Sequence, residues 1–159
     1  MAENLKFIAD HNVGKLAQWL RLMGYDTLFF DGEDDSQMVA IARAENRIIL
    51  TRDTGVMHRR IITQGRLKAV LITSDDAETQ LRQLITDLKL DCAFKPFTRC
   101  LVCNQPLVAR TRDEVKDRVP PYVFRTQSQY MECPHCHRIY WRGTHWQAMT
   151  HRLERICQS

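Results

Sequence analysis

The first residues of the sequence contain no long apolar run, and the chain has no internal repeat and no low-complexity tract. Acids occur at once in this segment, at Glu3 and Asp10, so neither a secretion signal nor a membrane span is expected there. Hydrophobic residues make up 44% of the 159 residues, enough for buried cores but below membrane composition. We therefore expect a folded protein of the cytoplasm.

Proline is absent from the first 95 residues, and all five prolines lie in the last 64. Charge is also uneven: residues 1–92 carry 12 Lys and Arg against 14 Asp and Glu, and residues 93–159 carry 11 against 5. We expect a boundary near residues 92–98 and two domains, 1–92 and 93–159, with different roles. The basic half is suited to phosphate backbones, although the same charge could be an ordinary solvated surface.

Short apolar runs alternate with longer amphipathic stretches between residues 5 and 91, a pattern typical of βαβ units. The expected strands are 5–9, 27–30, 47–51 and 68–73. The last two are continuously apolar, which favours central positions in a sheet covered on both faces. Helices are expected over 12–23, 35–44 and 76–90, with Gly24 and Asn46 suited to end the first two. The predicted fold class is α/β, with a mostly parallel four-stranded sheet flanked by helices.

The second half has its own short elements. Thr111 and Glu114 are spaced as a capping box that opens a short helix, and short strands are expected over 129–132 and 138–141. A terminal helix follows, and its inner face is expected to carry Trp146, Met149, Leu153 and Ile156.

Four of the six cysteines form two pairs, Cys100-x-x-Cys103 and Cys133-x-x-Cys136, with 29 residues between them. Two such knuckles can complete a tetrahedral shell of four thiolates around one ion. The shell is closed, so the predicted metal is a structural Zn²⁺ that folds a small zinc-ribbon domain. An iron site of the rubredoxin type would use the same four cysteines.

The remaining candidates for this shell are weaker. His135 and His137 lie close to the second pair, and one of them could replace a thiolate. Cys92 and Cys157 lie outside any motif and are expected to be ordinary thiols, since a chain without an export signal meets a reducing environment.

Three acids occur where predicted strands end or helices begin. Asp10 ends the first strand, Asp35 opens the second helix, and Asp53 follows the third strand. Parallel strands bring their carboxyl ends to one edge, so we expect these acids to converge there and bind Mg²⁺ or Mn²⁺. Each could instead be a helix N-cap, because Asp is favoured there. The candidates for a fourth acid are Asp34, Asp75 and Asp76.

These residues together resemble the Mut-7 C-terminal RNase domain family, a PIN-like nuclease fold fused to a zinc ribbon. The resemblance covers nearly the whole chain and is carried by runs 7–10, 14–27, 34–35 and 47–53, both cysteine pairs and 139–146. It implies metal-dependent cleavage of RNA, with Asp10, Asp35 and Asp53 as the acidic centre. Ser36 and Gln37 stand where related sequences often carry further acids, which implies a leaner metal site.

The function predicted from these features is a Mg²⁺- or Mn²⁺-dependent ribonuclease. Lys15, Arg21 and Arg52 are expected to contact phosphate, although Arg52 could equally pair with a neighbouring Asp. Basic residues of the ribbon are interleaved with aromatic ones and could hold single-stranded RNA: Lys95, Arg99, Arg110, Arg112, Arg138 and Arg142, with Tyr140, Trp141 and Trp146. Trp146 could instead pack under the terminal helix. The alternative is a non-catalytic RNA-binding or ribosome-associated adaptor with the same fold.

Overall fold

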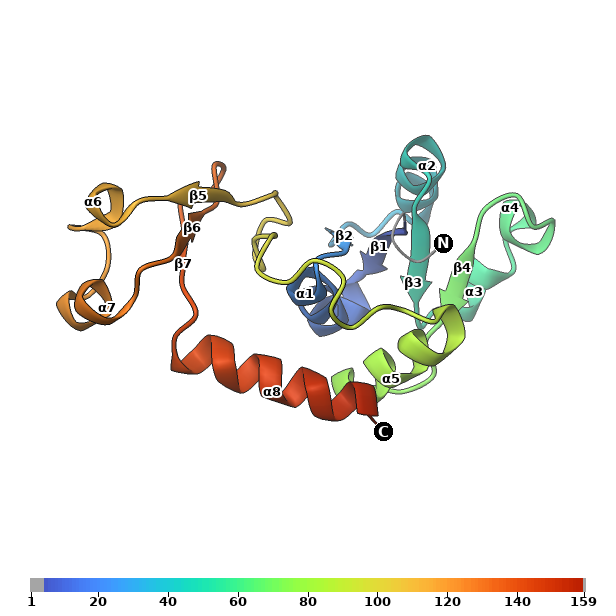
Figure 1. Cartoon of the computed structure of the whole chain (residues 1–159). Coiled ribbons are helices and arrows are strands. Elements are labelled where there is room, and N and C mark those ends of the chain that lie inside the picture. Colours follow the sequence, from blue (N-terminus) through green and yellow to red (C-terminus); the bar gives the residue numbers. More distant parts are fainter. Residues whose placement is uncertain (1–4, 159) are drawn as a thin grey trace.

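A computed structural model describes residues 5–158 and places two sheets at opposite ends of the molecule (Figure 1). The elements of the first part are β1 (Lys6–Asp10), the 3-10 helix η2 (His11–Val13), α1 (Gly14–Met23), β2 (Asp26–Phe30), α2 (Asp35–Glu45), β3 (Ile48–Thr51), α3 (Thr54–Met57), α4 (Arg60–Thr63), β4 (Ala69–Leu71) and α5 (Ala77–Leu88). Those of the second part are β5 (Val108–Arg110), α6 (Arg112–Val115), α7 (Pro121–Thr126), β6 (Tyr130–Glu132), β7 (Ile139–Tyr140) and α8 (Thr144–Gln158). Within 5–158, no helix is both long and apolar enough to cross a membrane.

The first sheet is parallel and has the strand order β2-β1-β3-β4, which confirms the predicted fold class. β1 and β3 are central, whereas β4 is an edge strand, so the prediction of a central β4 is wrong. Its apolar run has another cause, because both faces of this edge strand are covered. Val70 and Ile72 pack into one hydrophobic core, and Ala69 packs into the other.

The two cores lie on opposite faces of the parallel sheet. Alternate residues of β1 separate between them: Phe7 and Ala9 join the core formed with α1, α5 and α8, and Ile8 joins the core formed with α2, α3 and α4. The sheet is therefore a middle layer between two layers of helices, and its carboxyl edge stays open for polar side chains.

The predicted ends of two helices are confirmed. Gly24 ends α1 with φ of 101°, and Asn46 ends α2 with φ of 55°, both in the left-handed conformation. No range was predicted for a helix between the third and fourth strands, and the structure has two short ones there, α3 and α4.

The second sheet is antiparallel, with the order β5-β6-β7. The capping box of Thr111 and Glu114 is present, and the three-residue strand β5 was not predicted. α8 leaves this sheet and runs toward α5 (Figure 1), where Leu153 and Ile156 are buried in the same core as α1 and α5. The terminal helix thus joins the two parts of the chain.

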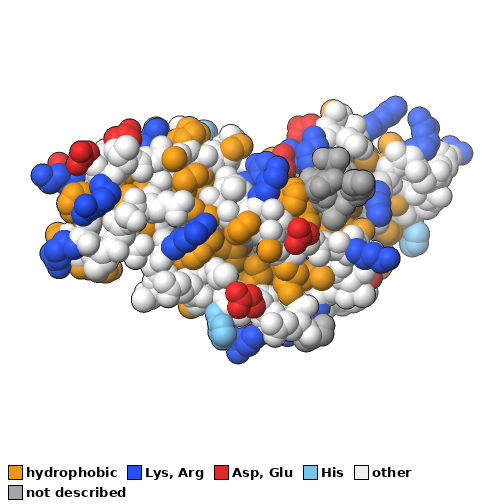
Figure 2. Space-filling model, in the orientation of Figure 1, with side chains coloured by type: hydrophobic (Ala, Val, Ile, Leu, Met, Phe, Trp, Pro, Cys, Tyr) orange, Lys and Arg blue, Asp and Glu red, His pale blue; other side chains and the backbone are white. Residues whose placement is uncertain are grey.

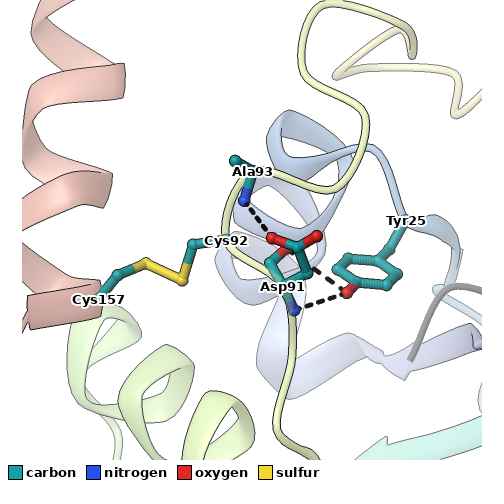
Figure 3. The surroundings of a disulfide bond; sticks show 5 residues. All are labelled: Tyr25, Asp91, Cys92, Ala93 and Cys157. Atoms are coloured by element: carbon teal, nitrogen blue, oxygen red, sulfur yellow. Dashed lines mark hydrogen bonds between the residues drawn. A yellow bond between two sulfur atoms is a disulfide. The ribbon is translucent and has the colours of Figure 1, made fainter. Parts of the chain in front are cut away.

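A disulfide connects Cys92 to Cys157, with 6.5 Å between the two Cα atoms. The expectation of two ordinary thiols is therefore wrong. Packing of α8 against the first core brings its last turn beside Cys92, a proximity that spacing in the sequence could not reveal (Figure 3). Next to Cys92, the amide of Asp91 donates to the hydroxyl of the buried Tyr25 at 2.9 Å, which fixes the segment leaving α5.

Candidate functional site

Asp10 ends β1 at the carboxyl edge of the parallel sheet, and its side chain is almost fully buried. Its Oδ1 accepts a hydrogen bond from the amide of His11 at 2.8 Å, and Nδ1 of the same histidine lies 3.0 Å away. Its Oδ2 accepts from the hydroxyl of Thr51, the last residue of β3, at 2.8 Å. Asp10 is therefore held in one orientation between the two central strands.

Asp53 lies beside it and is linked to it through Thr51. The Thr51 hydroxyl donates to Asp10 and accepts from the amide of Asp53 at 3.0 Å. Asp53 is also the N-cap of α3, because its Oδ1 accepts from the amide of Gly55 at 2.8 Å. The N-cap alternative is thus correct for one oxygen of Asp53, and the exposed side chain keeps a second oxygen.

Asp35 occupies the first position of α2, while Asp34 is the N-cap that accepts from the amide of Ser36 at 2.9 Å. Burial raises the pKa of Asp35, and the negative charges of Asp10 and Asp53 raise it further. Arg59 and His11 act in the opposite direction without reversing the shift. The three acids therefore share one electrostatic environment in which negative charge is not fully neutralised.

These three acids are nevertheless only loosely grouped. Among the described residues, the four cysteines are the one group of three or more His, Cys, Asp or Glu side chains close enough together to hold a metal ion. The acids supply hard oxygen ligands and mutual repulsion, which fit a divalent cation such as Mg²⁺ or Mn²⁺, with water completing its shell.

The candidates for a fourth acid differ in their roles. Asp76, and not Asp75, is the N-cap of α5, where it accepts from the amide and hydroxyl of Thr79. These bonds lower the pKa of Asp76. Asp75 is exposed after β4, at the same edge of the sheet as Asp10.

Two of the three predicted phosphate contacts remain available. Lys15 and Arg52 are exposed and make no ion pair or side-chain hydrogen bond with a described residue. Arg21 is different, because its guanidinium is buried and donates to the carbonyl oxygens of Thr27, Leu101 and Val102. The prediction of a phosphate contact at Arg21 is therefore corrected to a structural role.

The thiols of Cys100, Cys103, Cys133 and Cys136 lie within 4.8 Å of one another. The two knuckles are equivalent: the amide four residues after the first cysteine donates to its carbonyl oxygen at 2.9 Å in both. This fourth residue is Asn104 in the first knuckle and His137 in the second, and its backbone is in the left-handed conformation in both. Four soft thiol ligands in two matched turns fit a tetrahedral Zn²⁺.

Hydrogen bonds prepare the first knuckle for ionisation. Burial opposes ionisation of Cys100, but bonds from the Tyr140 hydroxyl and from backbone amides lower its pKa to about 7. Burial and the neighbouring thiols raise the pKa of Cys103. His137, considered as a substitute ligand, is engaged elsewhere, since its Nδ1 lies 3.0 Å from Glu132.

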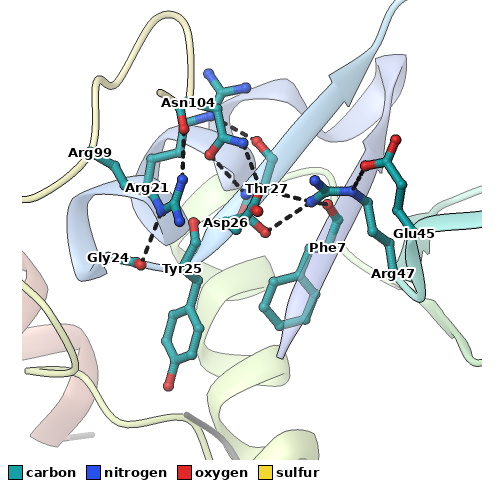
Figure 4. Close-up of polar contacts among 10 residues, drawn as sticks. All are labelled: Phe7, Arg21, Gly24, Tyr25, Asp26, Thr27, Glu45, Arg47, Arg99 and Asn104. Carbon is teal, nitrogen blue, oxygen red and sulfur yellow. Dashed lines mark hydrogen bonds and ion pairs between the residues drawn. The ribbon is translucent and has the colours of Figure 1, made fainter. Parts of the chain in front are cut away.

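A polar network that the sequence did not reveal joins the first knuckle to the parallel sheet (Figure 4). The Oδ1 of Asn104 accepts from the amide of Thr27 at 2.9 Å, and its Nδ2 donates to Asp26 at 2.7 Å. Asp26 also pairs with the buried Arg47 at 2.8 Å. The residue that follows Cys103 thus covers the open edge of β2, and Arg21 holds the carbonyls of the same knuckle.

Fold and site define an α/β protein that combines an acidic edge of a parallel sheet with a four-thiol metal-binding site. The model of the Mut7-C RNAse domain family matches residues 5–153, so the chain belongs to that family. No curated protein and no solved structure matches it. The family indicates an RNA-related nuclease function and an RNA substrate.

Proposed function

We propose that this protein is a Mg²⁺- or Mn²⁺-dependent ribonuclease that hydrolyses RNA phosphodiester bonds at the carboxyl edge of its parallel sheet. The observation that carries the proposal is the coupling of Asp10, Asp35 and Asp53. The Thr51 hydroxyl bonds the Asp10 carboxylate and the backbone amide of Asp53, and the charges of Asp10 and Asp53 raise the pKa of Asp35. The site lies between β1 and β3, where successive connections diverge to opposite sides of β1, and open α/β sheets bind ligands at such points.

The residues of the site divide the work. A divalent cation bound by the three acids would activate a water molecule and neutralise charge on the leaving oxygen. Asp10 supplies a carboxylate whose direction is fixed by His11 and Thr51. Asp53 keeps one oxygen beyond its N-cap bond, and Lys15 and Arg52 are free to orient phosphate.

The second part of the proposal concerns residues 93–159. We propose that they form a zinc-ribbon domain, with residues 1–92 as a PIN-like nuclease domain, and that Zn²⁺ at the four cysteines is structural. All four ligand positions are thiols, which leaves no open position for a substrate. A cytoplasmic location and a ribosome or RNA-processing partner remain predictions.

The test is cleavage of single-stranded RNA with Mn²⁺ or Mg²⁺ by the wild type, Asp10→Asn and Asp53→Asn. Each substitution removes a carboxylate charge, and Asn keeps the N-cap capacity of position 53. We expect cleavage to fall by about 1,000-fold in each variant, as for loss of a main electrostatic group in an active site. Asp87→Asn, in the last turn of α5, is the matched control and should cleave as the wild type does.

The second candidate function is a non-catalytic RNA-binding adaptor. It is favoured by the use of two of the three acids, Asp10 and Asp53, as helix caps, and by the loose grouping of all three. If the wild type and both Asn variants cleave equally and without need of a metal, the ribonuclease proposal is wrong and the adaptor is retained.

A further inference from the structure

A groove of about 730 Å³ lies between the second sheet and the first half of α8. Among the described residues, no Asp or Glu lines it. Its charged and titratable lining consists of Arg118, His137, Arg138 and His145. Its aromatic lining consists of Tyr122, Tyr140, Trp141 and Trp146. Cationic and aromatic side chains without acids are the surface that single-stranded nucleic acid prefers.

A second groove of about 460 Å³ continues the first toward the parallel sheet. Both are lined by Gln18, Leu101, His145 and Met149, so they form one trough. The far end of the trough is lined by Lys15, in the first turn of α1, and by Asp75, which follows β4. Asp75 places this end at the carboxyl edge of the parallel sheet, although Asp10 and Asp53 do not themselves line the trough.

The aromatic side chains of the trough differ in their freedom. The Tyr140 hydroxyl contacts Cys100 and the amide of Leu101, both at 3.1 Å, and the ring of Trp146 packs edge-on against Phe97. Tyr122 is 63% exposed, and its side chain makes no ring contact and no hydrogen bond with a described residue. The ring of Tyr122 thus has a free face, whereas these contacts hold Tyr140 and Trp146 in place.

The arginines differ in the same way. Arg118 is held by the buried Glu132, with two bonds of 2.9 and 3.2 Å. Arg138 is exposed and makes no side-chain hydrogen bond with a described residue. Arg138 is therefore the arginine of the groove that is free to contact a phosphate.

We infer that the trough binds single-stranded RNA, with a base stacked on Tyr122 and phosphates contacted by Arg138 and Lys15. This inference rests on the proposed function, because the trough would lead the strand to the acids. A duplex would hide the base faces that Tyr122 requires, so the strand must be unpaired. Charge supports this placement of the strand: the groove beside the second sheet lacks acids, whereas Asp75, Asp76 and Glu78 line the far end together with Lys15 and Arg152.

The first test is binding of fluorescently labelled single-stranded RNA of about 16 nucleotides to the zinc-loaded full chain, without added Mg²⁺ or Mn²⁺. Loss of a stacked base predicts binding about 10-fold weaker in Tyr122→Ala. Tyr122→Phe keeps the ring and should bind as the wild type does. The matched control is Arg125→Ala, an exposed residue of the same helix that does not line the trough.

The second test is the salt dependence of the same binding. Arg138→Ala should reduce the slope of log affinity against log salt by about 0.7, the value for one phosphate contact to a single strand. Arg125→Ala should leave the slope unchanged. The inference is wrong if Tyr122→Ala and Arg138→Ala bind as Arg125→Ala does, which is also the result expected if the trough serves a protein partner. Circular dichroism and zinc content of each variant establish that it is folded.

Failure of the inference and failure of the proposed function can be separated. With Mn²⁺ present, Tyr122→Ala should raise KM about 10-fold and leave kcat near the wild-type value, since the ring lies away from the acids. If RNA binds in the trough but is not cleaved, the inference is supported and the proposed ribonuclease activity is rejected. RNA cleaved with unchanged KM in Tyr122→Ala keeps the ribonuclease and removes the inference.

Discussion

The acidic edge and the four-cysteine cluster are both groups of potential metal ligands, but they are built differently. At the cluster, two equivalent knuckles aim four thiols at one point, within 4.8 Å of one another. At the edge, Asp53 also caps a helix, and Asp10 also binds the backbone of His11. The cluster is built from two local turns that meet, whereas the edge depends on the alignment of separate strands.

Folding of the second part should depend on its metal far more than folding of the first. Cys133→Ser should abolish zinc binding, and the protection of β5, β6 and β7 against hydrogen exchange should be lost. Structural zinc contributes on the order of 10 kcal/mol in small zinc domains. β1 and β3, which have their own cores, should stay protected.

Cys157→Ser is the control for this comparison, since Cys157 lies outside the cluster. It should keep one zinc per chain, measured by mass spectrometry of the metal. Loss of protection in the parallel sheet together with β5 to β7 would contradict the separation of the two parts. If the purified protein is coloured and contains iron, the four cysteines form a rubredoxin-type iron site and not a zinc site.

Glu132 makes the second part sensitive to acid. Bonds from Arg118, Arg110 and His137 lower the pKa of this buried carboxyl from 4.5 to about 2. A lowered pKa stabilises the fold above pH 4.5, and that stability is lost as pH falls toward 2.

Glu132→Gln should therefore cost about 2 kcal/mol at neutral pH, because the charged partners lose their bonds. Denaturant unfolding as a function of pH measures this loss of stability. The difference between the wild type and Glu132→Gln should disappear at low pH. Glu154→Gln, an exposed acid of α8, is the control. A constant difference between variant and wild type at all pH values would contradict the assigned cause.

Asn104 tests the connection between the two regions. Asn104→Gly keeps the left-handed backbone, at φ of 68°, but removes the bonds to Thr27 and Asp26, and should cost about 1–2 kcal/mol. Asn46→Gly is a matched control, since Asn46 is also left-handed but exposed at the end of α2. Equal effects of the two substitutions on thermal unfolding would show that the bonds of Asn104 to Thr27 and Asp26 do not stabilise the protein.

The smallest effect is expected at Asp35. Its raised pKa means that the folded protein without bound cation binds this proton more tightly, so stability falls as pH rises through the titration of Asp35. Asp35→Asn should raise the melting temperature slightly at neutral pH in the absence of divalent cations. Added Mn²⁺ should stabilise the wild type more than the variant. Destabilisation by Asp35→Asn without metal would contradict the repulsion.

The sequence predicts what depends on local pattern. Continuous and periodic apolar residues predicted the four strands of the parallel sheet, and Gly24 and Asn46 predicted two helix ends. The cysteine spacing predicted the two knuckles, because each knuckle is a local turn. These predictions required no knowledge of how distant segments pack.

What the sequence did not predict depends on such packing. The disulfide of Cys92 requires α8 to return to the first core, and the bonds of Arg21 require the first knuckle to dock on β2. The edge position of β4 was missed because both of its faces carry apolar residues that pack into the two cores, although this strand is only partly buried. A guanidinium beside predicted acids looks the same in sequence whether it faces phosphate or carbonyl oxygens.

The most direct test of the central claim is the anomalous diffraction of a crystal soaked in Mn²⁺. We predict a manganese ion at the carboxyl edge of the parallel sheet, bound by oxygens of Asp10, Asp35 and Asp53, in addition to the metal of the four cysteines. No manganese at that edge, with Asp10 and Asp53 bonded only to Thr51 and to the backbone amides that they already engage, would contradict it.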